Sequence, residues 1–311
     1  MGDSNQNDIP SHHGVGETGT IAYPNETIRL LLERSTCRSF TDRKVPPEIL
    51  RQVLEAGDHA ATGGNLQPYS IIKVENAETR KKLAEWNSQD FIATAPVNLM
   101  FCLDWRRLQR WAELEDAPFT ATASFRHFWI SFQDCIIAAQ NICTAADAMD
   151  LGSVYIGTVT ESIRKTCELL ELPQGVFPVV LLCIGYPKRR PAPRKKLGVD
   201  TIVHNEKYHE LPDDELLRAF DRKYPDLKVE PTDERLDDIS RVCRKVHSQG
   251  LATRCIEKIR RRGYISPVQR YFGLHYTADL MPERNTGYLK IMEERGFTWF
   301  KEYSSAGEGT E

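Results

Sequence analysis

Two arginines and two hydroxyls stand close together near the start of the sequence, in a pattern suited to binding an anion. Arg34 and Arg38 bracket Ser35 and Thr36, where a predicted helix ends. Guanidinium groups and hydroxyls at this spacing can grip a phosphate, or the polar edge of a ring, through charge-assisted hydrogen bonds. The alternative is that the arginines only neutralise the C-terminus of that helix, where cations are favourable.

A glycine-rich loop at 61–68 offers a second place for a flat ligand. Its paired glycines, Gly63 and Gly64, permit positive φ and let a planar molecule approach the backbone. Asn65 and Gln67 supply amide donors and acceptors beside them. A plain turn between a helix and a strand would explain the same residues.

A third segment, at 152–158, follows the longest predicted helix. Its Gly157 lets a backbone N–H point at a ligand atom with no side chain in the way. Neither a nucleophile elbow nor a phosphate-binding P-loop occurs in the sequence. The three segments are therefore interpreted together, as parts of one binding site.

The periodicity of apolar residues predicts the helices and strands that position these segments. The longest element is a helix from about Ser124 to Met149, whose apolar residues recur at spacings of three and four. Such a helix serves as the spine of a core or as part of a dimer interface, and one helix can do both. Shorter helices are predicted from Asn25 (apolar face Ile28, Leu31 and Leu32), from Pro47, and at 77–87 and 161–170; strands are predicted at 70–75, 97–103, 153–156 and 176–185.

Composition is that of an ordinary globular protein. Of the 311 residues 41% are apolar and 27% are charged, and the formal net charge is −3 with both signs interspersed. Neither a nucleic acid nor a membrane is therefore expected as a partner. The eight cysteines form no CxxC pair and have no metal-ligand spacing with histidine, which favours free thiols in the cytoplasm and no metal site.

Three stretches of different character divide the chain. Residues 1–23 are expected to form a flexible arm, and the GxGxxG pattern at 14–19 lacks the flanking strand and helix that a dinucleotide-binding turn needs. Residues 24–210 contain the three segments and form the predicted ligand-binding domain. Residues 211–311 are expected to form a helical extension that packs on the same domain or on a partner subunit, with helices at 212–223, 234–262 and 283–294.

In their order and separation these segments resemble the FMN-dependent nitroreductases and NAD(P)H–flavin oxidoreductases, over about residues 25–210. The resemblance is carried by Arg34-x-x-x-Arg38-x-Phe40, Gly63-Gly64-Asn65-Leu66-Gln67-Pro68, Gln89 before Ala95-Pro96, Tyr155-Ile156-Gly157 and Cys183-Ile184-Gly185-Tyr186-Pro187. It implies an α/β (α+β) fold, with a mixed, mainly antiparallel sheet flanked by helices. It also implies an intertwined homodimer with the long helix at its interface and two FMN sites between the subunits.

The resemblance further implies which residues contact the flavin. One of the two arginines would hold the phosphate and the other would lie near the N1–O2 edge of the ring. Gln89 would bind the ribityl or pyrimidine portion, Asn65 would come from the partner subunit's side, and the Gly157 amide would reach N5 or O4. Arg194 and Lys196 occupy the place of basic phosphate ligands. The complete set of expected cofactor-binding residues is Arg34, Ser35, Thr36, Arg38, Thr62, Gly63, Asn65, Gln67, Gln89, Ile156, Gly157, Thr158, Arg194 and Lys196.

The activity that the resemblance implies is a ping-pong reduction. NADPH or NADH would give hydride to flavin N5, and a nitroarene, a quinone or a free flavin would then take the electrons, with no catalytic side chain. Two alternatives stay open: a dehydrogenase or dehalogenase specialised for one metabolite, or an FMN-binding protein without turnover. The family's usual serine pair is replaced here by Thr62-Gly63, and Tyr69 stands where many members have tryptophan. These departures bear on the substrate more than on the flavin.

Overall fold

The computed structural model describes residues 23–304, and at its centre lies a four-stranded sheet with strand order β1-β2-β4-β3. The strands are β1 (Tyr69–Lys73), β2 (Val97–Asp104), β3 (Gly152–Ile156) and β4 (Val176–Gly185), each antiparallel to its neighbours. Every residue of β2 and β4 is buried, because these two strands form the middle of the sheet. The predicted fold class is confirmed, and the one parallel pairing among the described residues is an isolated bridge between Thr36 and Ser153.

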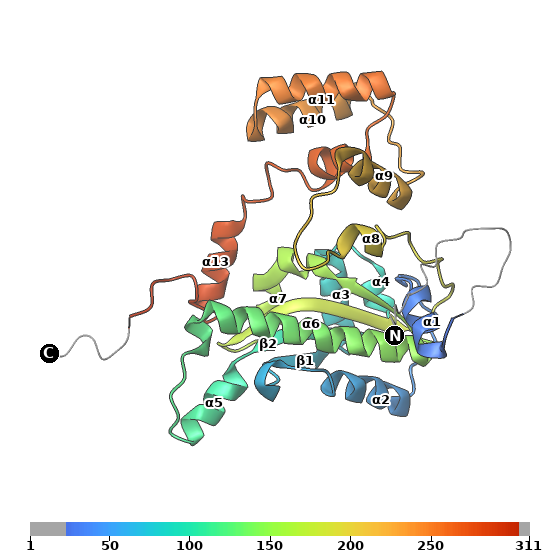
Figure 1. Cartoon of the computed structure of the whole chain (residues 1–311). Helices are drawn as coiled ribbons and strands as arrows, with labels where there is room; N and C mark the ends of the chain where they lie inside the picture. The colour runs from blue at the N-terminus through green and yellow to red at the C-terminus, as the bar shows by residue number, and fades with distance from the viewer. Residues whose placement is uncertain (1–22, 305–311) are drawn as a thin grey trace, which may run out of the picture.

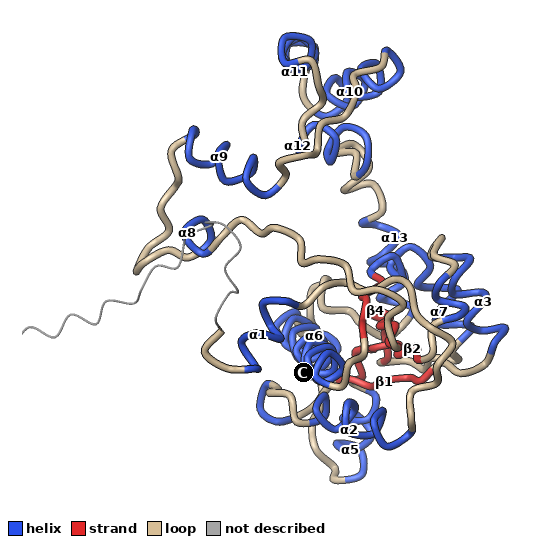
Figure 2. Tube along the Cα trace, turned by 90° about the vertical axis from the view of Figure 1, so that its right-hand side faces the viewer, coloured by secondary structure: helices blue, strands red, loops and turns tan. Residues whose placement is uncertain are grey.

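Helices cover both faces of the sheet. The long helix α6 (Phe125–Ala148) lies on one face, and α3 (Ala77–Trp86) and α7 (Ile163–Leu169) lie on the other (Figures 1 and 2). Helix α6 has nearly the predicted bounds. Ser124 caps its N-terminus, because the Ser124 side chain accepts a hydrogen bond from the His127 N–H. Helix α7 starts later than predicted, because Gly157–Ser162 form the 3-10 helix η3.

The face of α6 that packs on the sheet consists mostly of small residues. Ser131, Cys135, Ala138 and Ala139 are buried there, so the helix approaches the strands closely. Three of its four large aromatic residues are exposed instead: Phe125, Trp129 and Phe132 are 52%, 52% and 41% exposed, whereas Phe128 packs against the core. Helix α6 is thus a spine of the core and also an uncovered apolar surface.

Two helices precede the sheet. Asn25 caps α1 (Glu26–Glu33) by accepting from the Ile28 N–H, as its sequence predicts, and α2 (Pro47–Asp58) starts at its expected proline. The apolar face of α1 is not buried in this chain, however. Ile28, Leu31 and Leu32 are 36%, 47% and 62% exposed. Between α2 and α7 the chain also forms η1 (Gly63–Asn65), α4 (Phe91–Thr94), α5 (Arg106–Leu114) and η2 (Ala121–Ala123).

The helical region after β4 differs from the prediction at one place. The predicted helix 234–262 is two helices, α10 (Asp233–Val246) and α11 (Gln249–Arg262). His247 leaves helical geometry, and Ser248 caps α11 by accepting from the Leu251 N–H. The region also contains α8 (Val199–Ile202), α9 (Asp213–Lys223), α12 (Pro267–Arg270), the π-helical turn η4 (Tyr271–His275) and α13 (Asn285–Glu294).

Helices α10 and α11 stand away from the sheet (Figure 1) and have a small core of their own. That core consists of Leu236, Ile239, Ile259 and Ile265. The chain then returns, because Tyr288, Ile291 and Phe297 join the main core. The predicted N-terminal arm, except for Tyr23, and its glycine pattern lie outside the described residues. Within residues 23–304, no helix is long and apolar enough to cross a membrane.

Candidate functional site

The arginine segment lies along the outer edge of β3. Helix α1 ends at Glu33, and the backbone of Arg34 is extended with ψ 131°. Two residues later Thr36 bridges to Ser153, and the Cys37 N–H donates to the Ser153 carbonyl at 3.0 Å. Arg34, Ser35 and Thr36 are therefore held beside β3 as a short added strand.

A buried carboxylate anchors Arg34. Asp147, near the end of α6, is 8% exposed and lies 3.6 Å from Arg34 Nε, measured to its Oδ2. Its other oxygen lies 3.0 Å from Arg190 Nη1, and Arg190 also donates to the Leu151 carbonyl at 2.8 Å. Arg34 Nη2 lies 3.5 Å from Ser153 Oγ. The cluster ties α1, α6, β3 and the segment after β4 together.

Neither Asp147 nor Arg190 was expected from the sequence. The signal that could have revealed the pair is the position of Asp147 on the buried face of the long helix, because buried charges are almost always paired. Burial raises the pKa of Asp147, and the Arg190 guanidinium and then Arg34 act in the opposite direction. Arg34 Nε and Asp147 Oδ2 are buried without a hydrogen bond, because 3.6 Å is too long for one. The Arg34 side chain as a whole remains 21% exposed, so its guanidinium can also face a further acceptor.

A second group of predicted residues meets at the far end of β3. Gln89 Nε2 donates to Thr158 Oγ1 at 3.2 Å, and Thr158 Oγ1 donates to Asn87 Oδ1 at 2.8 Å. Asn87, which is 3% exposed and was not predicted, donates in turn to the Leu83 carbonyl. This chain of hydrogen bonds fixes the turn that carries Gly157 to the end of α3.

The space above Gly157 is open. A Cβ placed on this residue would meet no other atom within 4 Å, so this part of the backbone can receive a ligand. The neighbouring Ile156 is 1% exposed, and its side chain belongs to the core. The Ile156 side chain therefore cannot contact a ligand, and only the backbone of this residue is available for the expected contact.

The glycine-rich loop is pinned to α6 by another buried acid. The Gly63 N–H donates to both carboxylate oxygens of Asp134 at 3.1 Å, and a Cβ on Gly63 would lie 2.6 Å from the Ile130 side chain. Close packing against Ile130 therefore requires glycine at position 63. This requirement would hold equally if the loop were only a turn between a helix and a strand. Burial raises the pKa of Asp134, and the Gly63 N–H partly offsets this effect.

The rest of this loop turns sharply and presents Asn65 outward. Gly64, Asn65 and Gln67 all have positive φ (60°, 56° and 49°). The Gln67 side-chain amide donates to the Asp58 carbonyl and carboxylate, so it holds the loop in place. Thr62 Oγ1 is buried without a hydrogen-bond partner among the described residues.

Within one chain, the loop and the arginine segment do not meet. Their anchors, Asp134 and Asp147, are thirteen residues apart on α6, which corresponds to about 20 Å along the helix axis. The β3 edge brings together Arg34, Ser35 and Thr36 at one end and the Gln89–Thr158 pair at the other. The remaining expected basic residues, Arg38, Arg194 and Lys196, are exposed.

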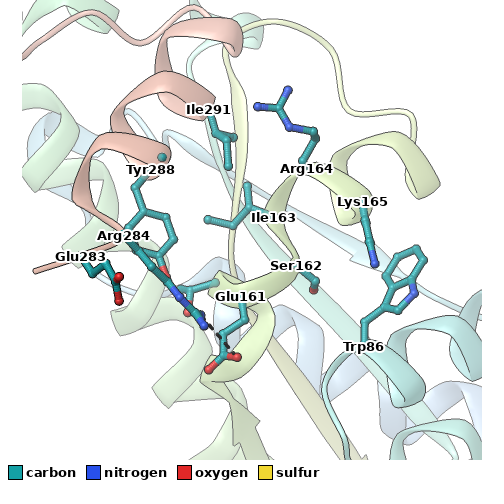
Figure 3. A pocket seen from close by; sticks show the side chains of 12 residues that line it. Trp86, Glu161, Ser162, Ile163, Arg164, Lys165, Glu283, Arg284, Tyr288 and Ile291 are labelled. Carbon is teal, nitrogen blue, oxygen red and sulfur yellow. Dashed lines mark ion pairs between the residues drawn. The ribbon is translucent and has the colours of Figure 1, made fainter. Parts of the chain in front are cut away.

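A hollow of about 550 Å³ lies next to the Gly157 turn, between α7 and α13 (Figure 3). In Figure 3 the Lys165 ammonium faces the Trp86 ring, 5.5 Å from its centroid. Arg284 pairs with Glu161 at 3.6 Å across the hollow. Acidic and basic residues are both present in its lining, so the hollow has no strong preference for an anion or a cation.

Comparison with known proteins identifies the family of this chain. The model of the nitroreductase family matches residues 31–186. The FMN reductase [NAD(P)H] of Bacillus subtilis is 36% identical over 204 residues, which cover 64% of this chain and 81% of that protein.

Two solved structures are similar as well. The NADPH:FMN oxidoreductase from Vibrio harveyi, complexed with NAD+, is 32% identical with a TM-score of 0.59, covering 63% of this chain and 83% of its own. The structure of B. megaterium NfrA2 is 26% identical with a TM-score of 0.68, covering 89% of this chain and 100% of its own. The family match spans both ends of the β3 edge and the glycine-rich loop, and on this evidence the chain belongs to the nitroreductase family.

Proposed function

We propose that this protein passes electrons from NADPH or NADH through bound FMN to a small acceptor, such as a nitroarene, a quinone or a free flavin, in a ping-pong sequence. The observation that supports this most is the grouping of the expected flavin ligands along the β3 edge, in a chain of the nitroreductase family. Relatives named FMN reductase and NADPH:FMN oxidoreductase support an FMN-dependent NAD(P)H oxidoreductase.

The residues at the β3 edge and in the loop fit FMN. The Arg34 side chain is 21% exposed and lies next to the hydroxyls of Ser35 and Thr36, a combination suited to a phosphate. The open space above Gly157 leaves room for a ring against the backbone. The site would thus offer a cation, hydroxyls and a bare backbone amide to one elongated, phosphorylated molecule.

The two arginines would take different parts of FMN. Arg34 shares Asp147 with Arg190, which begins the basic segment that carries Arg194 and Lys196. Arg34 would therefore face the phosphate with these cations. Arg38, exposed and four residues further on, would lie near the N1–O2 edge, where a cation stabilises the negative charge that develops on reduction.

FMN supplies the hydride chemistry when it is bound, so no side chain has to act as a catalytic acid or base. The role of the protein itself would be to bind FMN and to orient it. The Gly157 N–H would donate toward N5 or O4, and the Gln89–Thr158–Asn87 chain of hydrogen bonds would keep that turn in place. Asp134 would hold Gly63 so that the loop backbone stays close to the ring.

We further propose that the working unit is a homodimer. The anchors of the loop and of the arginine segment lie about 20 Å apart along α6, so we infer that a second copy brings one chain's loop to the other chain's arginines. The exposed aromatic residues of α6 and the exposed apolar face of α1 supply an apolar surface for that contact. In a dimer with twofold symmetry, two equivalent sites would result.

The cytoplasm is the compartment that the cysteines favour. All eight lie within the described residues and are free, and six of them are buried. Buried free thiols persist in a reducing environment. The acceptor would be a small molecule that reaches the flavin from solution.

The decisive experiment is the visible spectrum of the purified protein, before and after anaerobic NADPH or NADH. A flavin band that bleaches with the nicotinamide and returns on addition of a quinone is the expected result. A colourless protein that also fails to take up FMN would overturn the proposal. A band that persists in the presence of both nicotinamides would indicate flavin binding without this turnover.

A further inference from the structure

Helices α10 and α11 form a hairpin that carries two neighbouring thiols. Cys243 lies near the end of α10 and Cys255 in the middle of α11, and the two helices run side by side away from the sheet (Figure 1). Both cysteines are free and partly exposed. We propose that this pair is a site of reversible oxidation, where a peroxide converts the two thiols to a disulfide that joins α10 to α11. The site goes beyond the flavin chemistry and does not depend on it.

Helical spacing places both thiols at the interface between the two helices. Cys243 follows the buried Ile239 by one turn of α10. Cys255 precedes the buried Ile259 by one turn of α11. Ile239 and Ile259 belong to the small core of the hairpin, and both cysteines pack against that core. Ala252 is 1% exposed one turn before Cys255, and its small side chain lets the helices approach closely there.

The two thiols also interact directly. Burial raises the pKa of the Cys243 thiol, and the adjacent Cys255 raises it further, through its charge and a hydrogen bond between the two side chains. In addition, Gln269 Nε2 donates to Cys255 Sγ at 3.6 Å, which holds this sulfur in place. The two sulfurs therefore already lie next to each other, which is the first requirement for a disulfide.

The oxidation balances with one molecule of hydrogen peroxide. One sulfur of the pair attacks the O–O bond, becomes a sulfenic acid and releases a water. The second sulfur then attacks the first, so the S–S bond forms and a second water leaves. The two thiols lose two electrons and two protons in total, and the peroxide is reduced to two waters. Peroxide can reach this pair because both side chains are partly exposed, whereas the six other cysteines are buried.

The disulfide would hold closed a part of the molecule that can open on its own. The hairpin has a core separate from that of the sheet, so its opening need not disrupt the sheet. A bond between positions 243 and 255 restricts the open form and thereby favours the closed one. Arg244, Lys245 and Arg254 are exposed between the two cysteines, so cleavage by trypsin reports on opening.

Peroxide treatment of the purified full-length protein tests the chemistry. After the peroxide is removed, free thiols are blocked with N-ethylmaleimide under denaturing conditions, and peptides are mapped by mass spectrometry without reduction. We expect one linkage within the chain, between Cys243 and Cys255, that dithiothreitol reverses, while the six buried cysteines react with the blocking reagent. Absence of this linkage, or oxidation of both cysteines to sulfinic acids without a bond, would overturn the proposal.

Limited digestion with trypsin tests the effect on the hairpin. In the wild type, peroxide should slow cleavage at Arg244, Lys245 and Arg254 by roughly tenfold or more, and dithiothreitol should restore the original rate. Cys243→Ser keeps the size of the side chain but cannot form the bond, so peroxide should leave its cleavage rate unchanged. An unchanged rate in the wild type, or equal slowing in Cys243→Ser, would contradict the proposal; the peptide mapping does not require this variant to fold.

Discussion

At the scale of single residues, Asp147 is the group on which phosphate recognition would depend. It is the buried partner of both Arg34 and Arg190. We predict that Asp147→Asn, which removes the charge and keeps the shape, weakens FMN binding by about tenfold, because hydrogen bonds to charged groups contribute about 1.5–3 kcal/mol. Riboflavin has no phosphate, so its affinity should change little. The measurement is the dissociation constant of each flavin by fluorescence titration.

The matched control for this variant is Asp150→Asn. Asp150 is exposed just beyond the same helix with φ 59°, a conformation that asparagine tolerates well. Both flavins should bind this control as they bind the wild type. Equal weakening of FMN and riboflavin in Asp147→Asn would show that Asp147 serves the fold and not the phosphate. A wild type that binds neither flavin would instead refute the proposed function itself.

Asp134 makes the free energy of unfolding depend on pH, and the raised pKa of this residue determines the sign. Burial raises its pKa above the ordinary value of 3.8, so the folded protein binds this proton more tightly than the unfolded chain does. Its contribution to the free energy of unfolding therefore decreases as pH rises from 3.8 through the raised pKa. Asp134→Asn cannot ionise and still offers an oxygen to the Gly63 N–H. The variant should gain stability relative to the wild type over that window, as measured by urea denaturation; a constant difference would contradict this account.

The sequence could reveal those site residues that stand in short local patterns, but not their partners from distant parts of the chain. Arg34, Gln89 and Gly157 stand in short patterns and were expected at the site, and the structure places them along one strand. Their partners Asp147 and Asn87 were missed, because each lies far away in the sequence and is recognised only when folding brings it near. The expected roles toward the flavin remain predictions until binding is measured.

At the scale of secondary-structure elements, the periodicity of apolar residues predicted where helices and strands lie better than it predicted which of their faces are buried. The bounds of α6 and of all four strands were close to expectation, because their apolar patterns are long and regular. The same patterns did not reveal that the aromatic residues of α6 and the apolar face of α1 are exposed in this chain. Apolar spacing shows which residues share one face of a helix, but not what covers that face. The break at Ser248 lies among polar residues, where periodicity is weak.

Two helical glycines allow a test of element packing with opposite expected signs. A Cβ on Gly57 in α2 would lie 2.6 Å from the Ile142 side chain of α6, whereas a Cβ on Gly287 in α13 meets nothing within 4 Å. Gly57→Ala should therefore destabilise the protein by about 1–3 kcal/mol through overpacking. Gly287→Ala should stabilise it by about 0.5–1 kcal/mol, the usual gain in a helix. Thermal or chemical denaturation measures both, and a stabilised Gly57→Ala would show that α2 and α6 are not this close.

At the scale of the whole molecule, the exposed apolar surface and the divided site point to the same assembly. Phe125, Trp129 and Phe132 lie along α6, the helix that anchors the loop at one position and the arginine segment at another. Soluble monomers rarely leave a contiguous surface of this kind uncovered. If a second copy covers α6, the same contact completes the flavin site.

Mixing two inactive variants tests this arrangement directly. Arg34→Ala removes the phosphate contact of one chain, and Asn65→Tyr places a bulky ring on the exposed loop that would serve the partner's flavin. Each homodimer should lose FMN from both sites. In a mixed dimer, one site combines both defects and the other has an intact Arg34 with an intact loop. Random co-assembly with twofold symmetry should therefore restore about a quarter of the wild-type flavin content, measured on the purified mixture.

The alternative geometry gives a different result in the same experiment. If one chain supplies both its arginine segment and its loop to one flavin, every chain in the mixture carries a defect, and no flavin is recovered. Combining both substitutions in one chain and co-assembling it with the wild type provides the control. That mixed dimer has one defect in each shared site, so it should lose all its flavin if the sites are shared, but keep half if each chain binds its own. A shared site and two independent sites predict opposite changes of flavin content in these two mixtures. The comparison therefore distinguishes the two arrangements irrespective of how stable each variant is.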